Sequence, residues 1–397
     1  MTIRAYDVGS IRSAEALVLA QVPEGALMQR AAAGLATACA GVLRRRRGRV
    51  TGARIVVLAG AGNNGGDALW AGARLAGRGG RVDALLLAPS AHAEGLAALH
   101  AAGGRSLAVP AGAASTPDGL RPATRLLAAA DLVVDGIVGL GGAPGLREPA
   151  ARLVAALDEL APRPAVVAVD LPSGVDADGG TTPAPHVRAD LTVTFGAAKP
   201  CLLVPPAARA AGEVQVVDIG LGPCLPPVPA VDRLTPDDVD RLWPVPGPAD
   251  DKYSRGVVGV VAGSAAYPGA AVLTTGGALR AGAGMVRYVG PAEPTSRVRA
   301  RWPEVVTGPG RVQAWALGSG VDPDDDGGGQ PAAVREALAQ ALEAKVPAVV
   351  DAGALALLAR PDWRRLAGPH LLLTPHAGEL ARLLGSWGER EVARQDV

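Results

Sequence analysis

Apolar runs of strand length recur along the first part of the chain, and alanine-rich helical stretches such as residues 150–160 separate several of them. The first run, Ile55–Leu58, is β-branched and apolar, as is typical of a buried parallel strand. The strand-like stretches cover residues 55–58, 81–88, 131–139, 165–174, 190–197 and 212–220. Such alternation indicates βα units around a mostly parallel sheet. We therefore predict a Rossmann-like three-layer α/β sandwich over residues 1–220.

A second α/β pattern follows a proline-rich connection. Residues 221–229 are rich in proline, residues 234–244 read as a short capped helix, and prolines recur up to residue 250. Further strand-like stretches then occupy residues 256–264, 284–291, 314–322, 347–355 and 371–380. The sequence therefore predicts a linker at 221–250 and a second α/β domain at 251–397.

A dense polar cluster follows the first strand, where the chain reads GAGNNGGD over residues 60–67. The glycines allow a tight turn and a close approach of the backbone to a ligand. We expect Asp67 to begin a helix over 68–78, since a carboxylate suits the positive end of the helix dipole. Asn63, Asn64 and Asp67 add oxygens that can hold a sugar, a cation or a hydrated ring. A bare strand-to-helix connector is the plainer interpretation.

Two further polar clusters follow predicted strands. Asp135 precedes the glycine-rich stretch Gly139–Gly145, and Asp170 precedes Ser173 by three residues. Ligands in open parallel sheets bind outside the carboxyl ends of the strands, so we expect the clusters to meet. Asn64, Asp135 and Ser173 offer only oxygen ligands, which favours an alkali or alkaline-earth cation over zinc. Taken singly, each aspartate reads as a cap or a turn former.

The composition is that of an ordinary globular protein. Formal net charge is +1, so we expect neither nucleic acid nor an anionic membrane as partner. The three cysteines have no metal-ligand spacing, which fits a reducing compartment. We find no secretion signal and expect no apolar stretch of membrane-spanning length. The expected location is the cytoplasm.

Four motifs in the first half resemble the NAD(P)HX epimerase domain, in order and spacing. They read GAGNNGGDAL, VVDGIVGLGG, VDLPSGVDAD and TFGAAKPCLL, and the stretch around Ala14 and Glu15 also agrees. The resemblance implies interconversion of the R and S hydrates of NADH and NADPH, with Asp170 in proton transfer and potassium as the cation of Asn64, Asp135 and Ser173. The residues that it implies for the substrate are Asn63, Asn64, Gly65, Gly66, Asp67, Gly139, Leu140, Gly141, Gly142, Ala143, Pro144, Gly145 and Asp170.

The second half resembles the NAD(P)HX dehydratase domain, a ribokinase-like α/β fold. The agreement lies in AGSAAYPGAAVLTTGGALRAGAG, ALGSGVD, VVDAGAL and LTPHAGELARLLG. The resemblance implies ADP with magnesium as the dehydration cofactor and Ala270, Gly320 and His376 as substrate contacts. The family's Gly-Thr-Gly-Asp motif does not occur in the sequence. We therefore expect this domain to be truncated and this chain to lack dehydratase activity.

Two other functions compete with a bifunctional hydrate repair enzyme. An NAD(P)-dependent oxidoreductase predicts GxGxxG with an acidic residue about 20 positions on, but here the turn reads GAGNNGG and Asp83 lies inside an apolar strand. A non-catalytic module of the same fold predicts loss of the polar site residues, all of which are present. We expect a homo-oligomer that acts on the small molecule NAD(P)HX.

Overall fold

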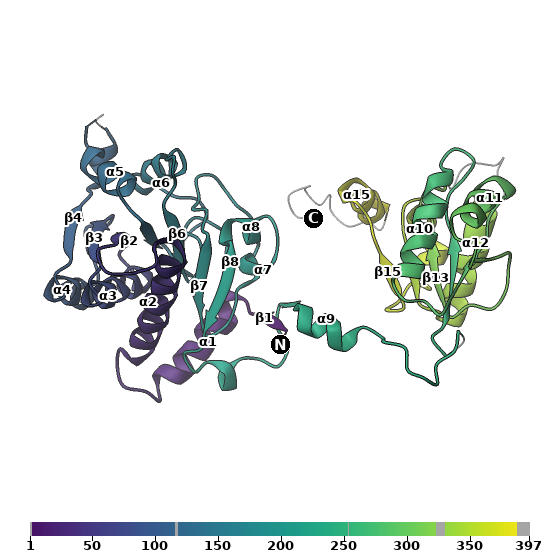
Figure 1. Cartoon of the computed structure of the whole chain (residues 1–397), viewed down its shortest axis with the longest axis horizontal. Coiled ribbons are helices and arrows are strands. Elements are labelled where there is room, and N and C mark those ends of the chain that lie inside the picture. The colour runs from purple at the N-terminus through teal and green to yellow at the C-terminus, as the bar shows by residue number, and fades with distance from the viewer. Residues whose placement is uncertain (1, 116–117, 253, 323–329, 387–397) are drawn as a thin grey trace. The chain divides into compact units, whose positions relative to one another are not determined.

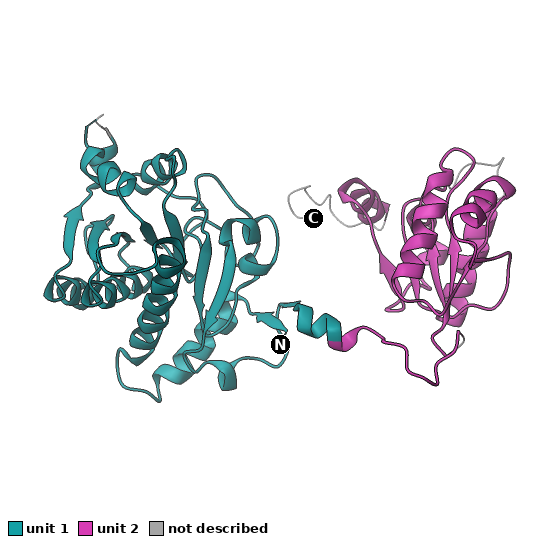
Figure 2. Ribbon diagram, in the orientation of Figure 1, with its two compact units in different colours: residues 1–240 teal, residues 241–397 magenta. Residues whose placement is uncertain are grey.

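The structure is a computed structural model that describes residues 2–115, 118–252, 254–322 and 330–386 (Figure 1). It divides into two compact units, residues 1–240 and residues 241–397 (Figure 2). The division falls inside the segment 221–250, for which the sequence predicts a linker. The last eleven residues of the predicted second domain, 387–397, lie outside the described residues.

The first unit is built on a seven-stranded parallel sheet with the strand order β4-β3-β2-β5-β6-β7-β8. Asp135 on β5 lies in register between Leu58 on β2 and Ala168 on β6. The strands are β2 (Arg54–Ala59), β3 (Arg81–Leu86), β4 (Arg105–Ala108), β5 (Leu132–Gly136), β6 (Ala165–Val169), β7 (Leu191–Phe195) and β8 (Glu213–Val217). The predicted parallel sheet is confirmed, and β4 is a strand that the sequence analysis missed.

Helices cover both faces of this sheet, because successive strand residues point to opposite faces. On one face Ile55 and Val57 share a core with α2 (Ala26–Arg47), α3 (Asn63–Gly77) and α4 (Ala93–Ala101). On the other face Val56 and Leu58 pack with α5 (Arg121–Ala128) and α6 (Ala150–Asp158). The predicted three-layer sandwich is therefore confirmed. Helix α1 (Val8–Leu19) joins the first core through residues that include Ile11 and Ala14.

Two local expectations for this unit are wrong. Helix α3 begins at Asn63, so Asp67 lies within the helix and does not begin it. Residues that follow the predicted boundary at 220 also belong to the unit, because β9 (Val231–Arg233) pairs antiparallel with β1 (Ile3–Ala5).

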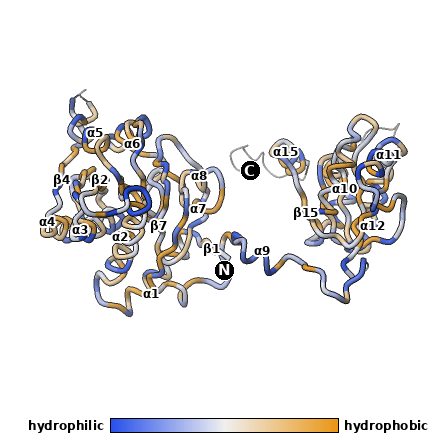
Figure 3. Tube along the Cα trace, viewed as in Figure 1, coloured by the Kyte–Doolittle hydropathy of each residue, from blue (hydrophilic) through white to orange (hydrophobic). Residues whose placement is uncertain are grey.

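Helix α9 (Pro236–Leu242) follows β9 and is mostly hydrophilic (Figure 3). Thr235 and Asp238 exchange hydrogen bonds at its start, which confirms the predicted capped helix.

One helix contradicts the expectation that no apolar stretch is as long as a membrane span. Helix α2 has 22 residues and is apolar enough by length and composition to cross a membrane. Ten of its residues are buried in the first unit, among them Leu35 and Leu43. Four arginines, Arg44–Arg47, form its last turn, where cations suit the dipole. A core helix of a soluble domain passes the same test, so α2 is weak evidence for a membrane.

The second unit contains a six-stranded parallel sheet with the order β12-β11-β10-β13-β14-β15. Helices α10 (Pro268–Arg280) and α11 (Ala292–Arg301) cover one face, and α12 (Gln330–Ala344), α13 (Gly353–Leu358) and α15 (Ala377–Ser386) cover the other. A short helix α14 spans Pro361–Arg364. The strands are β10 (Val257–Val261), β11 (Met285–Tyr288), β12 (Val306–Thr307), β13 (Ala314–Leu317), β14 (Ala348–Val350) and β15 (Leu371–Leu373). The predicted second α/β pattern is confirmed.

Candidate active site

A cavity of about 850 Å³ opens at the carboxyl ends of β2, β5 and β6. The strand order turns back between β2 and β5, since β3 and β4 lie on one side of β2 and β5 to β8 on the other. Such a topological switch point is where open α/β sheets bind ligands. The volume is that of a small-molecule or cofactor site. The three polar clusters predicted from the sequence therefore come together in one place.

Most of the predicted substrate residues line this cavity. Asn63, Asn64 and Asp67 line it from the start of α3, and Asp170 from the end of β6. All seven residues of Gly139–Gly145 line it as well. Gly65 and Gly66 do not line the cavity, and Gly65 has a packing role instead. A Cβ on Gly65 would lie 2.2 Å from the carbonyl oxygen of Gly60, so only glycine fits there.

Asp170 sits in an uncommon backbone conformation directly after β6. Its φ is +66°, in the left-handed region, which short polar residues such as aspartate tolerate best. The residue is buried, and its backbone N–H donates to the Val193 carbonyl on β7 at 2.8 Å. Non-glycine residues in such conformations cluster at functional sites. The strand end therefore directs one carboxylate into the cavity at a defined position.

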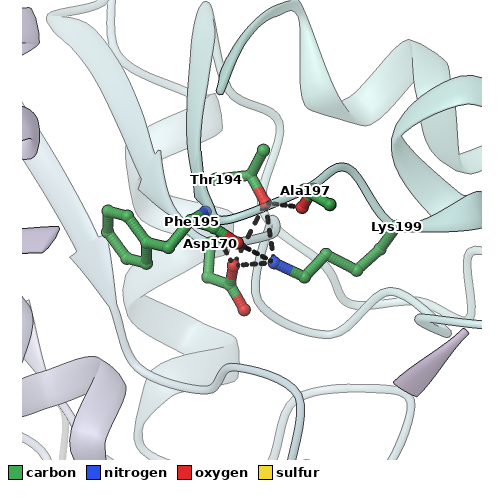
Figure 4. A network of polar contacts seen from close by, with 5 residues as sticks. All are labelled: Asp170, Thr194, Phe195, Ala197 and Lys199. Carbon is green, nitrogen blue, oxygen red and sulfur yellow. Dashed lines mark hydrogen bonds and ion pairs between the residues drawn. The ribbon is translucent and has the colours of Figure 1, made fainter. Parts of the chain in front are cut away.

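A polar network holds one oxygen of this carboxylate (Figure 4). Oδ1 of Asp170 lies 2.5 Å from Nζ of Lys199 and 3.1 Å from Oγ1 of Thr194. Lys199 is buried and also contacts Thr194 Oγ1 at 2.9 Å and the Phe195 carbonyl at 3.2 Å. Lys199, the lysine of the motif TFGAAKPCLL, therefore forms a buried ion pair with Asp170.

Asp67 is the second acidic group of the cavity. It is buried, and its Oδ1 has no hydrogen-bond partner among the described residues. Burial raises the pKa of Asp67 well above its usual value, and the charges of Asp170 and Glu15 raise it further. Burial and Asp170 also raise the pKa of Glu15, which lines the cavity from α1. Because charging Asp67 is unfavourable here, this side chain is suited to donate a hydrogen bond as a neutral acid.

The residues expected to hold a cation form one cluster at the edge of the cavity, which Asn64 itself lines. Ser173 donates its hydroxyl to Oδ1 of Asp135 at 2.6 Å and its backbone N–H to Oδ2 at 2.8 Å. The amide of Asn64 approaches Gly139, where a Cβ would lie 3.0 Å from Oδ1 of Asn64. The amide nitrogen of Asn64 is buried and has no partner among the described residues. The oxygens of Asn64, Asp135 and Ser173 form the hard donor set that an alkali cation prefers, whereas the orphaned amide nitrogen is an N–H donor that a cation cannot satisfy.

Helix α1 contributes two residues to the cavity, Glu15 and Arg12, that were not predicted as site residues. Glu15 belongs to a stretch that carries the family resemblance, but no role was assigned to it. Nη2 of Arg12 donates to the Leu140 carbonyl at 3.2 Å in the glycine-rich loop. Phe195, at the end of β7, adds an aromatic ring to the lining. Arg12 is far from the strand-end motifs in sequence, so spacing gave no signal for it.

The second unit brings two of its three predicted residues together. A Cβ on Gly320 would lie 2.5 Å from the Cβ of Ala270, which places Gly320, after β13, against the first turn of α10. The Gly263 N–H donates to the Ser319 carbonyl at 2.7 Å and links the ends of β10 and β13. His376 has a side chain that is 69% exposed, and its ring contacts Glu379 and the Gly378 N–H. No contact of His376 with the other two is seen among the described residues.

The fold and site define a two-unit α/β enzyme with a ligand cavity at a switch point. Residues 24–201 match the family model described as YjeF-related protein N-terminus, and residues 258–397 match the model described as NAD(P)H-hydrate dehydratase. The chain is 46% identical over 388 residues to the bifunctional NAD(P)H-hydrate repair enzyme Nnr of Mycobacterium tuberculosis. That match covers 96% of this chain and 75% of the relative. The chain therefore belongs to the family of bifunctional NAD(P)H-hydrate repair enzymes.

Two further relatives are each named for one of the two activities. An NAD(P)H-hydrate epimerase of Microbacterium testaceum is 43% identical over 225 residues, which cover 56% of this chain and 81% of the relative. A solved ADP/ATP-dependent NAD(P)H-hydrate dehydratase from Bacillus subtilis is 28% identical, covering 38% of this chain and 55% of that one, with a TM-score of 0.31. Family membership confirms the predicted family and enzyme class, and it supports hydrate repair over the oxidoreductase and the non-catalytic module.

Proposed function

We propose that the first unit interconverts the R and S hydrates of NADH and NADPH in the cavity at the ends of β2, β5 and β6. The observation that carries this proposal is the convergence of Asp170, Asn63, Asn64 and Asp67 on one cavity with the loop Gly139–Gly145. Membership of the family supports it. The epimers differ at C6 of the nicotinamide ring, the carbon that carries the added hydroxyl beside the ring nitrogen.

Asp170 is the proposed proton-transfer group. The carboxylate takes the proton of the C6 hydroxyl while the bond between C6 and the ring nitrogen breaks, which leaves a carbonyl at C6. The nitrogen takes up a solvent proton. Rotation of the carbonyl and reclosure on its other face give the opposite epimer, and both protons return to where they began. A general base that acts on such a step contributes roughly 100- to 10,000-fold to the rate.

The other cavity residues bind the substrate in this proposal. Asn63, Asn64 and the neutral acid of Asp67 offer hydrogen bonds to the ring amide and ribose. In the loop Gly139–Gly145, Pro144 has no backbone N–H, and those of Gly142 and Gly145 donate to the carbonyls of Gly139 and Gly174. The other backbone N–H groups of this loop and the Arg12 guanidinium suit the phosphates, because amides and a positive charge both favour anions. Gly65 and Gly66, which the resemblance also implies, support the substrate site through packing: Gly65 fits against the preceding turn, and Gly66 leaves room for the side chains of His92 and Met28.

A potassium ion is the proposed occupant of the cluster of Asn64, Asp135 and Ser173. Its donors are hard oxygens, and among the described residues no group of three or more His, Cys, Asp and Glu side chains is placed to hold a metal. The ion would neutralise the buried carboxylate of Asp135, whose pKa burial raises to about 6. It would also fix the Asn64 amide at the edge of the cavity.

The second unit is proposed to hold the substrate side of the site at which the family's domain dehydrates the S hydrate to NAD(P)H with ADP and magnesium as cofactors. The activity itself is still not expected of this sequence, because the Gly-Thr-Gly-Asp motif does not occur in it. The support for the substrate side is the match of residues 258–397 to the dehydratase family and the meeting of Ala270 and Gly320 beyond β10 and β13. His376 is the third proposed substrate contact. We infer that the whole chain is a soluble cytoplasmic homo-oligomer that acts on NAD(P)HX and binds neither nucleic acid nor a membrane.

Chromatographic conversion of one hydrate into the other tests the epimerase proposal. Purified protein is mixed with R-NADHX in potassium buffer without nucleotide, and the S form is followed over time. Conversion well above the spontaneous rate is expected from the chain as it stands. Asp170→Asn is the matched control, since it keeps the size of the side chain and removes the base. Conversion at the spontaneous rate by the unaltered chain would refute the proposal.

A further inference from the structure

Lys199 is buried beside the active-site cavity although lysine is rarely buried unless paired. Its side chain is 1% exposed, and its ammonium group contacts three oxygens: Asp170 Oδ1, Thr194 Oγ1 and the Phe195 carbonyl (Figure 4). An ammonium has three N–H donors, so this geometry uses all of them. The proline at position 200 also holds the Lys199 backbone extended, with φ −112° and ψ 154°. Lys199 is therefore fixed at both its backbone and its head group.

The two carboxylate oxygens of Asp170 have different surroundings. Oδ1 accepts from Lys199 Nζ, Thr194 Oγ1 and the Phe195 N–H, the last at 3.4 Å. Oδ2 has no hydrogen bond among the described residues, and Figure 4 shows it without a dashed contact. Asp170 lines the cavity, whereas Lys199 and Thr194 do not. The network therefore holds Oδ1 from behind and leaves Oδ2 as the oxygen that a ligand can reach.

We propose that Lys199 and Thr194 are positioning residues for epimerisation, which fix Asp170 so that its Oδ2 takes and returns the substrate proton. This inference rests on the proposed function of Asp170. Neither residue touches substrate. Their effect is on the orientation of the base, and small misplacements of a reacting group cost large factors in rate. A purely structural role, in which Lys199 only neutralises a buried charge, is the competing explanation.

Thr194 allows a test that leaves the buried ion pair intact. Valine keeps the β-branched shape of threonine without its hydroxyl, and serine keeps the hydroxyl without the β-branched shape. Thr194→Val keeps the β-branched shape on β7 and removes the bond to Asp170, and Thr194→Ser keeps the hydroxyl. We expect Thr194→Val to lower kcat for R-NADHX about 10-fold with KM changed less than about 3-fold, and Thr194→Ser to stay within about 3-fold of wild type. Equal rates in the two variants would overturn the role of Thr194.

Lys199 calls for a double-mutant cycle, because breaking a buried ion pair also destabilises the fold. Lys199→Met is expected to lower kcat about 100-fold in the wild-type background, by misplacing the base. In the Asp170→Asn background the same substitution is expected to change kcat less than about 2-fold, since no carboxylate remains to be positioned. If Lys199→Met does not fold, Thr194→Val and Thr194→Ser carry the test alone, because Thr194 bonds the same oxygen of Asp170 as Lys199 does.

The outcomes separate this inference from the proposed function. If the wild-type chain does not epimerise the hydrates, the proposed function fails. If the wild type is active and Lys199→Met keeps its kcat, or loses the same factor with and without Asp170, the positioning role is refuted. The binding affinity for NADPH, measured by calorimetry, is expected to be unchanged in Lys199→Met, whereas a collapsed cavity would weaken it.

Discussion

Ser173 donates a hydrogen bond to each carboxylate oxygen of Asp135, from its hydroxyl to Oδ1 at 2.6 Å and from its backbone N–H to Oδ2 at 2.8 Å. The Ser173 hydroxyl also accepts from the Val138 N–H at 2.9 Å. These bonds join the ends of β5 and β6 to the start of the loop that lines the cavity. A cation bound to this cluster would therefore stabilise the loop as well as the carboxylate.

Potassium is expected to stabilise the first unit more strongly at alkaline than at acidic pH. Burial raises the pKa of Asp135 from its usual 3.8 to about 6. Without a cation, stability is lost as the pH rises between these two values, because the unfolded state ionises first. A cation binds the carboxylate and offsets this loss above about pH 6, whereas below it the proton competes with the ion.

The measurement is the melting temperature in potassium and in tetramethylammonium at equal ionic strength. The difference between the two salts is expected to be large at about pH 8 and small at about pH 5. Asp135→Asn is expected to abolish the difference at both values. A potassium effect that is independent of pH would contradict the assignment of Asp135 as a ligand.

Asp170→Asn is expected to lower kcat for epimerisation by about 100- to 10,000-fold and to leave KM within several-fold of wild type. The amide keeps the shape of the carboxylate but cannot take the proton of the C6 hydroxyl. Rates are compared with both hydrates as starting material, after subtraction of the spontaneous reaction. A variant that turns over normally would reduce Asp170 to a turn residue after β6.

The strands and the polar residues at their ends were predictable because each depends on a short, continuous stretch of sequence. The apolar runs around Ile55 and Val133 and the residues that follow them have local signals, and parallel topology then brings the strand ends together. Lys199 could not be assigned in this way, because its partner Asp170 is 29 residues away and the pairing depends on the packing of β7 beside β6. The same holds for Arg12, which reaches the loop 128 residues further on.

The start of α3 shows where a local rule misled. An aspartate after glycines favours a helix that begins at Asp67, yet the helix begins at Asn63 and includes Gly65 and Gly66. The reason lies in packing against the turn just before the helix: glycines are poor helix formers, but Gly65 lies too close to the Gly60 carbonyl for any side chain. Close packing within the turn therefore overrides helix propensity at this site.

Asp67→Asn is expected to stabilise the first unit at neutral pH. Burial raises the pKa of Asp67, so the folded state binds the proton more tightly than the unfolded state. The contribution of Asp67 to the free energy of unfolding is fully present below the usual aspartate pKa. It is lost as the pH rises towards the pKa that Asp67 has in the folded protein. The asparagine does not ionise, so its melting-temperature advantage is expected to grow from about pH 4 to about pH 7. An advantage that does not change with pH would show that Asp67 is charged in the folded protein.

Gly65→Ala is expected to destabilise the first unit by about 1–3 kcal/mol and to lower epimerase activity. The new Cβ would lie 2.2 Å from the Gly60 carbonyl oxygen and 3.0 Å from the Gly60 nitrogen, so α3 or the turn before it must move. Asn64 and Asp67 lie on that helix and would shift with it.

Gly62→Ala is the matched control, because a Cβ there has nothing within 4 Å and φ is −90°. We expect the control to stay within about 0.5 kcal/mol of wild type in urea unfolding. Equal stability of the two variants would show that α3 can move away from Gly60 without cost, and that the fit of Gly65 against this turn does not hold Asn64 and Asp67 in place.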